Sequence, residues 1–180
     1  MRPRWSALAA TALLAALGAL AGCSQGTGYA VPDAACGVGV GAAALKPLLP
    51  AGDTLRLQPE DLGQGSARCT LSVDAKPALS LKTDVSTEVA DLPKVIQEKL
   101  DRSGHPEKIA LPGGEGWVAD SLALATVKCT FQGQPRLFIT EVAAHGGPSD
   151  VAKRRSALTA LITAYEPAAR KAAGCTPGPS

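Results

Sequence analysis

Hydrophobic and polar residues alternate along this chain with two different periods. A period of two, typical of half-buried strands, runs through short segments that glycine and proline separate. These segments predict strands at 53–58, 67–73, 79–85, 108–111, 116–119, 123–131 and 136–143. A period near 3.6, typical of amphipathic helices, predicts helices at 38–49 and 87–102 and a last helix that begins near 150.

Capping residues and prolines refine the helix boundaries. Pro93 fits the first turn of the second helix, where its missing N–H costs little. Ser149 or Asp150 is expected to cap the last helix, and Gly174 to end it. Pro167 is expected to kink or restart that helix, because proline removes a hydrogen bond from the helix interior.

The order of these elements predicts an α+β fold. We expect one domain with an antiparallel sheet of about six strands and two or three packed helices. Segments 69–71 and 77–81 resemble segments 129–131 and 135–139, and an amphipathic helix follows each pair. The first cysteine and proline are eight residues apart (69 to 77) and the second six (129 to 135). Either an internal duplication or coincidence in an Ala- and Leu-rich chain explains the match.

The start of the chain has the layout of a secretory signal. Arg2 and Arg4 precede a short apolar run, 7–21, which closes on small residues. The run is Ala-rich and shorter than the roughly 20 strongly apolar residues that cross ~30 Å of hydrocarbon. A cleaved signal is therefore favoured over a permanent transmembrane helix.

The apolar run ends in Leu20-Ala21-Gly22-Cys23, which resembles the lipobox of bacterial lipoprotein signal peptides. The resemblance implies that the Cys23 thiol carries diacylglycerol, that the signal is cut before Cys23, and that the new amino terminus is open to acylation. Two acyl chains, at ~0.8 kcal/mol per buried methylene, make a stable anchor. The alternative is an ordinary cleaved signal with a chance cysteine.

Cleavage at this point divides the chain into three parts. Residues 1–22 are the expected lipoprotein signal peptide, 23–32 a lipidated flexible tether rich in Gly and Ser, and 33–180 an extracytoplasmic domain. The alternative for the tether is that Tyr29 and Val31 begin a strand.

The signal peptide accounts for the positive charge of the chain. Without Arg2 and Arg4 the Lys+Arg count falls from 18 to 16, against 16 Asp+Glu, so the formal net charge falls from +2 to zero. A neutral chain without a basic stripe argues against a nucleic-acid partner. It also argues against electrostatic membrane binding beyond the lipid itself. The remaining 158 residues (180 minus 22) suffice for one core, and we expect a monomer.

The cysteine count agrees with export. Four cysteines remain besides Cys23, an even number that predicts two disulfides in an oxidising compartment. Their spacing fits neither a redox pair nor a zinc site. Three pairings are open. We favour Cys36 with Cys69 and Cys129 with Cys175, in which each bond ties the end of a predicted helix to a predicted strand.

No catalytic, metal-binding or cofactor motif is found. His105 and His145 lie in predicted loops without ligand spacing, and no serine stands in a Gly-x-Ser-x-Gly elbow. Trp117, the only tryptophan after residue 22, follows Glu115 in a Gly-rich segment. It either packs under its own hairpin or, with Glu115, marks a recognition surface. The basic run 153–155 reads as the solvated face of the last helix.

The body of the chain, a cysteine-framed segment that begins with Ala35-Cys36-Gly37, also resembles the small envelope lipoproteins of unknown function in high-GC Gram-positive bacteria. This resemblance implies the same location and a compact α+β domain, similar to the sheet-and-helix sandwiches of photosystem extrinsic proteins. It implies no functional residues.

From these observations we expect a non-enzymatic binding or interaction module at the extracytoplasmic face of the cell membrane. Its partner would be an envelope protein or a small ligand. The alternative is an envelope hydrolase whose site is not visible as a motif, with Glu115, Asp120 and His145 as the first residues to inspect.

Overall fold

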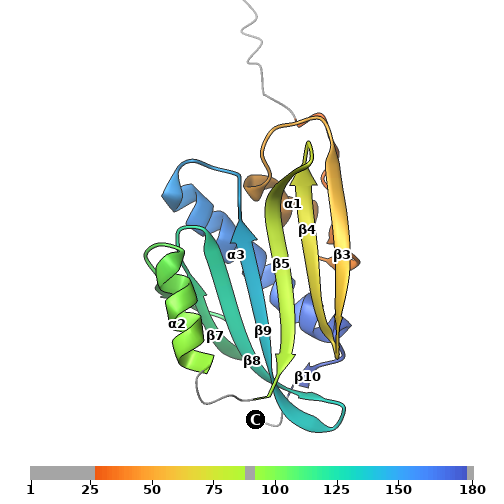
Figure 1. The fold of residues 1–180 in the computed structure, drawn as a ribbon, viewed down its shortest axis with the longest axis vertical. Coiled ribbons are helices and arrows are strands. Elements are labelled where there is room, and N and C mark those ends of the chain that lie inside the picture. The colour runs from red at the N-terminus through yellow and green to blue at the C-terminus, as the bar shows by residue number, and fades with distance from the viewer. Residues whose placement is uncertain (1–26, 88–91, 178–180) are drawn as a thin grey trace, which may run out of the picture.

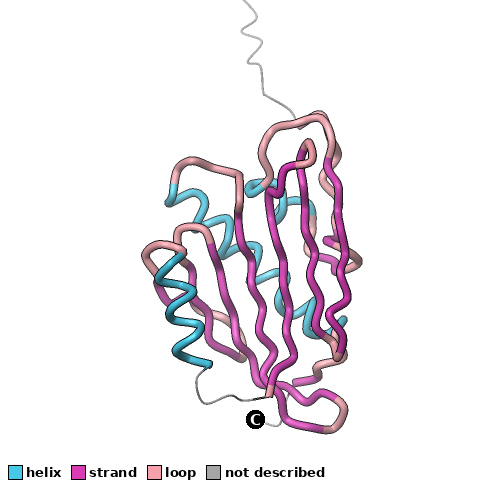
Figure 2. Tube along the Cα trace, viewed as in Figure 1, coloured by secondary structure: helices cyan, strands magenta, loops and turns pink. Residues whose placement is uncertain are grey.

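The computed structural model describes residues 27–87 and 92–177, which form one large sheet with helices on both faces (Figures 1 and 2). The small elements near the start are β1 (Ala34–Ala35), β2 (Val38–Gly39), α1 (Ala42–Leu45) and the short 3-10 helix Lys46–Leu48. The elements that follow are β3 (Leu55–Gly63), β4 (Ser66–Val73), β5 (Lys76–Ser86), α2 (Leu92–Arg102), β6 (Glu107–Ile109), β7 (Gly114–Val118), β8 (Leu122–Phe131), β9 (Gln134–Ala144), α3 (Val151–Ala172) and β10 (Thr176–Pro177).

The large sheet is antiparallel and has eight strands, more than the six or so expected from the sequence. Seven strands follow the order β3-β4-β5-β9-β8-β7-β6, and β10 pairs with β8 beyond the end of β7. β10 is only two residues long and has no periodicity of its own. It joins the sheet because Cys175 holds it against β8, an effect that no local sequence pattern reveals.

Tight turns connect the long strands. The β3–β4 turn places Gln64 and Gly65 at φ +50° and +78°, and the β8–β9 turn places Gln132 and Gly133 at +51° and +74°. Such left-handed pairs match the twist of the flanking strands. The turns fix the register, and the register decides which side chains face each helix.

The main core lies between one face of the sheet and α3 with α1. Strand residues such as Leu71, Leu81 and Phe138 meet Leu158 and Leu161 of α3 there, and all five side chains are fully buried. In Figure 1, α3 and α1 lie behind the sheet. This layer carries most of the apolar burial, so it is the main source of stability.

A second, smaller core lies on the opposite face beneath α2. Ile96 and Leu100 of α2 pack against Leu122 and Leu124 of β8 and Ile139 of β9. Because side chains alternate along a strand, Ala123 and Ala125, each next to one of these β8 leucines, face the main core. Figure 1 shows α2 in front of β7 and β8, while the same face of β3, β4 and β5 has no helix over it.

The uncovered half of this face is polar. Cross-strand register places Arg56 beside Ser72, and Arg68 beside Lys82. Two ion pairs cross it, Arg68 with Glu60 at 3.0 Å and Lys82 with Asp84 at 3.4 Å. The side chains of these ion pairs are exposed or partly exposed, so this region is a solvated surface. Accessible ion pairs of this kind contribute little to stability.

Two helix predictions need correction. The predicted helix 38–49 is wrong over its first part, because residues 38–39 pair with β1 and α1 begins only at Ala42. Gly41 has φ +79°, which no interior helical residue adopts. Of the kink or restart expected at Pro167, the restart does not occur, since α3 is continuous from Val151 to Ala172. Buried residues on both sides of Pro167 hold that helix on the sheet.

Other helix signals are confirmed. Asp150, not Ser149, caps α3, and its carboxylate accepts from the Lys153 amide at 3.1 Å. Gly174 has φ +75° directly after the end of α3, the conformation that terminates helices. The two residues thus set the ends of the longest helix.

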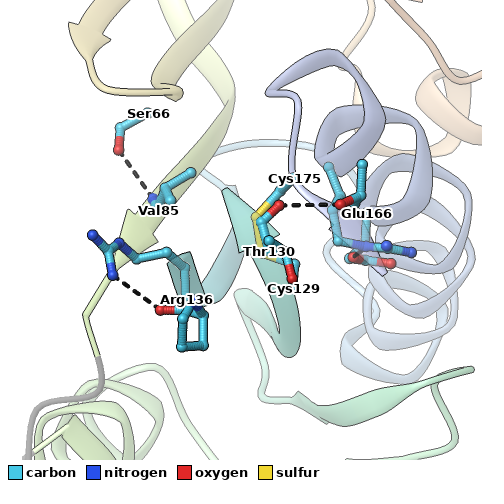
Figure 3. Close-up of a disulfide and its surroundings, with 10 residues drawn as sticks. Ser66, Val85, Cys129, Thr130, Arg136, Glu166 and Cys175 are labelled. Atoms are coloured by element: carbon cyan, nitrogen blue, oxygen red, sulfur yellow. Dashed lines mark hydrogen bonds and ion pairs between the residues drawn. A yellow bond between two sulfur atoms is a disulfide. The ribbon is translucent and has the colours of Figure 1, made fainter. Parts of the chain in front are cut away.

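The favoured disulfide pairing is confirmed. Cys36 is bonded to Cys69 and Cys129 to Cys175, with Cα–Cα distances of 5.8 and 5.5 Å. Figure 3 shows the second bond beside Thr130 and Glu166. This bond joins the end of α3 to a strand, as expected. The first joins β4 to the β1–β2 turn instead of a helix end.

The two strand-strand-helix units occupy different geometries. Cys69 pairs with Leu81 in the first hairpin, whereas Cys129 pairs with Arg136 in the second, closer to its turn. Leu81 faces the main core, but Ile139, its counterpart in the sequence match, faces α2. The helices α2 and α3 also lie on opposite faces of the sheet. The sequence match therefore does not correspond to equivalent positions in the sheet.

The part of the expected tether that the structure describes contacts the folded body. The amide of Gly28 donates to the carbonyl of Gly52 at 2.7 Å, and the Tyr29 hydroxyl donates to the carbonyl of Pro50. Tyr29 and Val31 also pack against the main core without forming a strand. The body thus begins before residue 33.

Candidate functional site

The edge hairpin β6–β7 carries the sequence-predicted recognition residues. Trp117 of β7 lies opposite Lys108 of β6, and the Lys108 ammonium stands 6.0 Å from the centre of its ring. The same ammonium lies 3.7 Å from a carboxylate oxygen of Glu115. We call these three residues the Trp117 patch. A cation over an indole face and beside a carboxylate is attracted by both groups.

Strand alternation and register build this arrangement. Glu115 and Trp117 are two apart on β7, so their side chains share the sheet face that carries α2. The antiparallel register of β6 and β7 places Lys108 opposite Trp117 on that face. On the other face, a Cβ on Gly116 would lie 2.8 Å from Cγ1 of Ile109, so a larger residue there would force the Ile109 side chain to shift.

Trp117 has features of both alternatives that the sequence left open, a side chain packed under its hairpin and an accessible recognition residue. Its side chain packs against the margin of the small core under α2, yet it stays partly exposed. The side chains of Lys108 and Glu115 at its rim are 76% and 65% exposed. An aromatic anchor with a polar, accessible rim has the composition of a protein-binding surface.

The residues expected to form a hydrolase site do not come together in the described contacts. His145 Nε2 lies 2.9 Å from Oγ of Ser80 on β5, on the open polar face. Asp120 instead contacts His105 and Arg155, and Glu115 contacts Lys108. In the described part of the chain, no carboxylate contact to His145 is found.

Asp120 is the centre of a separate charged cluster near the start of α3. Its two carboxylate oxygens lie 3.0 Å from Arg155 Nη1 and 3.3 Å from His105 Nδ1. Burial raises the pKa of Asp120, but hydrogen bonds from His105 and Arg155 outweigh it, and the net effect lowers that pKa. Arg155 Nη2 also lies 2.8 Å from Glu107, an ion pair without hydrogen-bond geometry. The cluster ties the segment after α2 to α3.

The basic run 153–155 is not uniformly solvated, contrary to the sequence-based reading. Arg154 donates to the carbonyls of Asp120 at 2.5 Å and Pro148 at 2.6 Å, and Arg155 is partly buried. Only Lys153 faces solvent fully. Both arginines therefore act as structural clamps, since their donors are used on neighbouring loops and on Asp120.

A shallow cleft of about 260 Å³ lies beside the end of α3. Its lining comes from the last turns of the helix and from β10: Pro167, Arg170, Lys171, Gly174, Cys175, Thr176 and Pro177. The Arg170 guanidinium is neutralised by Glu166, 2.7 Å away and buried. A helix C-terminus carries a partial negative charge, which Lys171 at this cleft offsets.

Within residues 27–87 and 92–177, no cluster of three or more His, Cys, Asp or Glu side chains is arranged to hold a metal ion. Nor does any helix in those ranges have the length and apolar character needed to cross a membrane. Cys23, the expected lipidation site, and the signal segment 1–22 lie outside the described residues.

Sequence analysis found Trp117 and Glu115 but missed Lys108 and Ser80. Lys108 could have been placed by pairing the predicted strands 108–111 and 116–119 as a hairpin, which brings position 108 opposite 117. Ser80 could not, because its contact with His145 depends on the pairing of β5 with β9 across 65 residues of chain.

Comparisons of the chain with protein-family models, curated proteins and solved structures find no match.

Proposed function

We propose that this chain is a lipid-anchored extracytoplasmic lipoprotein that acts as a binding module, with the Trp117 patch as its recognition surface. The observation that carries the proposal is the patch itself, a partly exposed tryptophan with an accessible cation and carboxylate at its rim. Tryptophan is among the residues that most often dominate binding energy at protein interfaces. The partner is an envelope protein or a small ligand.

The anchor rests on the Leu20-Ala21-Gly22-Cys23 motif, and two other observations agree with it. The two disulfides suit an oxidising compartment outside the cytoplasm. Gly28, whose amide donates to Gly52 in the folded body, is five residues after Cys23, so a chain of that length can place the body at most about 18 Å from the anchor.

Palmitate labelling tests the anchor. Label should be incorporated by the wild-type chain and lost in Cys23→Ala, while Cys36→Ala should keep it. Label retained by Cys23→Ala would sink the lipoprotein assignment.

Site-specific photo-crosslinking in the native envelope tests the recognition surface. A photoreactive residue at position 117 should capture a discrete partner, whereas one at Lys94, exposed on the far side of α2, should not. Equal capture at both positions, or none at 117, would reject the Trp117 patch as the binding surface.

The contact between Ser80 and His145 favours one alternative, a hydrolase. In that case Ser80 would be the nucleophile and His145 the base that removes its proton. A fluorophosphonate probe should then label the protein on Ser80, and labelling should fall in His145→Gln but not in His105→Gln. The binding module is preferred because the structure shows no carboxylate contacting His145 within the described residues.

A further inference from the structure

The Trp117 patch contains a cation-binding arrangement whose present occupant is a residue of the same chain. The Lys108 ammonium lies 6.0 Å from the centre of the indole ring and 3.7 Å from the Glu115 carboxylate. An aromatic face with a nearby carboxylate is the combination that proteins use to hold ammonium and guanidinium groups. The chain thus supplies two parts of such a site and also fills it.

Nothing in the surroundings commits Lys108 to this position. Its side chain is 76% exposed and sits on a three-residue edge strand. Ion pairs between exposed groups contribute only about 0–1 kcal/mol, and an exposed cation–π contact about 0.5–1 kcal/mol. A lysine side chain is long and flexible, so it can leave the ring without moving the strand.

The indole ring stays in place when Lys108 moves away, because Trp117 packs against the core under α2. Glu115 lies two residues away on the same strand, and its 65% exposed side chain stays within reach of the ring. A second cation therefore meets a fixed indole face with a carboxylate in reach.

We infer that the Trp117 patch recognises a basic group of its partner, a lysine ammonium or an arginine guanidinium of a peptide segment. This inference rests on the proposed binding function. The partner's cation takes the place of Lys108 over the ring and beside Glu115. Lys108 then acts as an internal competitor that lowers affinity and excludes weak cationic ligands. Lys99 of α2 does not compete for this position, because it is paired with Glu141.

Fluorescence of Trp117 measures this exchange directly. The experiment uses the full-length chain in mild detergent with Trp5→Phe, so that Trp117 is the only tryptophan. The probes are a capped tetralysine peptide and, as a charge control, capped tetraglutamate. Tetralysine should change the Trp117 emission in a saturable manner at low ionic strength, and tetraglutamate should not.

Variants separate a specific site from general electrostatics. Lys108→Ala and Lys108→Gln should bind tetralysine roughly threefold to tenfold more tightly, because the internal competitor is gone. Glu115→Gln should bind it several-fold more weakly. Lys94→Ala and Glu98→Gln, which change the same charges on the exposed side of α2, should leave binding within about twofold of wild type.

Three outcomes would overturn the inference. The first is a Trp117 emission that millimolar tetralysine leaves unchanged in both the parent and the Lys108 variants. The second is an equal effect of Glu115→Gln and Glu98→Gln on tetralysine binding. The third is weaker tetralysine binding by both Lys108 variants. If photo-crosslinking at position 117 still captures a partner in any of these cases, the binding function stands and only the basic-group recognition fails. If crosslinking fails while tetralysine binds, the patch is a cation site without the proposed envelope partner.

Discussion

The two faces of the large sheet differ in how they are held together. The face toward α3 carries the larger core, and both disulfides are rooted in it through Cys69 and Cys129. The face toward α2 has a smaller core, to which the helix contributes Ile96 and Leu100 as buried residues. The small core lacks any cysteine among its described members.

From this difference we expect stability and the proposed recognition to depend on different faces. The side chains of Lys108 and Glu115 in the Trp117 patch are largely exposed, so a change of either removes little buried area. A substitution there should alter binding more than folding. The α3 face, in contrast, should tolerate little change, because its residues are fully buried and linked by covalent bonds.

Removal of either disulfide should have the largest effect on stability. The bonds close loops with sequence separations of 33 and 46, for which loop-closure entropy gives about 4 kcal/mol each. Cys36→Ser with Cys69→Ser, and Cys129→Ser with Cys175→Ser, should each lower the free energy of unfolding by about this amount in urea titrations. A loss below 1 kcal/mol would show that the α3 face does not depend on the bonds.

Mass spectrometry of the non-reduced exported protein should detect no free thiol.

Matched leucine substitutions should rank the two cores directly. Leu158 in the main core and Leu100 in the small core are both fully buried. Leucine-to-alanine changes cost about 2 to 5 kcal/mol, depending on how far the neighbours relax. We expect Leu158→Ala near 4 kcal/mol and Leu100→Ala near 2 kcal/mol, because α2 can settle onto the sheet. The reverse ranking would contradict the division of roles between the faces.

Removal of a buried hydroxyl from the main core should have a smaller effect, and it should stabilise the protein. Among the residues that the structure describes, the fully buried Thr140 Oγ1 has no hydrogen-bond partner, whereas Thr83 Oγ1 opposite it donates to the Ala67 carbonyl at 3.5 Å. An unpaired buried hydroxyl costs free energy, so Thr140→Val should raise the free energy of unfolding by up to about 1 kcal/mol. Thr83→Val should be neutral or destabilising. If Thr140→Val were less stable than the wild type, the result would contradict the absence of a hydrogen-bond partner for the Thr140 hydroxyl.

Acid stability should show the smallest effect. The pKa of Asp74 is lowered by hydrogen bonds from Thr54, of which the one from the backbone amide contributes most. Burial raises the pKa of Asp120, but contacts with His105 and Arg155 outweigh it and lower that pKa overall. A lowered folded-state pKa contributes stability that is present above the unfolded pKa of about 3.9 and is lost as pH falls through the folded value. Asp74→Asn and Asp120→Asn should therefore flatten the fall in thermal midpoint below about pH 4. Glu98→Gln, which lacks these contacts, serves as control, and an unchanged slope in both aspartate variants would contradict the expected linkage.

The sequence was most informative where structure is local. Alternation placed most strands within about three residues, although β3 continues to Gly63, five residues past its predicted end. Asp150 and Gly174 set the ends of α3 because capping depends on neighbouring residues alone. Local rules failed at residues 38–41, where pairing with β1 outweighs a weak helical pattern. At Pro167 the helix does not restart, because packing on both sides keeps it continuous.

By itself, the sequence determined the α+β class, the number of disulfides and two members of the recognition surface that we propose. It favoured one of three cysteine pairings without deciding among them. Periodicity, cysteine parity and residue type can be read along the chain, so these inferences needed no contacts between distant segments. Only the tertiary structure decided that α2 and α3 lie on opposite faces, that β10 joins the sheet, and that Ser80 contacts His145. Each of these depends on strand register and on contacts between different elements, which a single sequence does not specify locally.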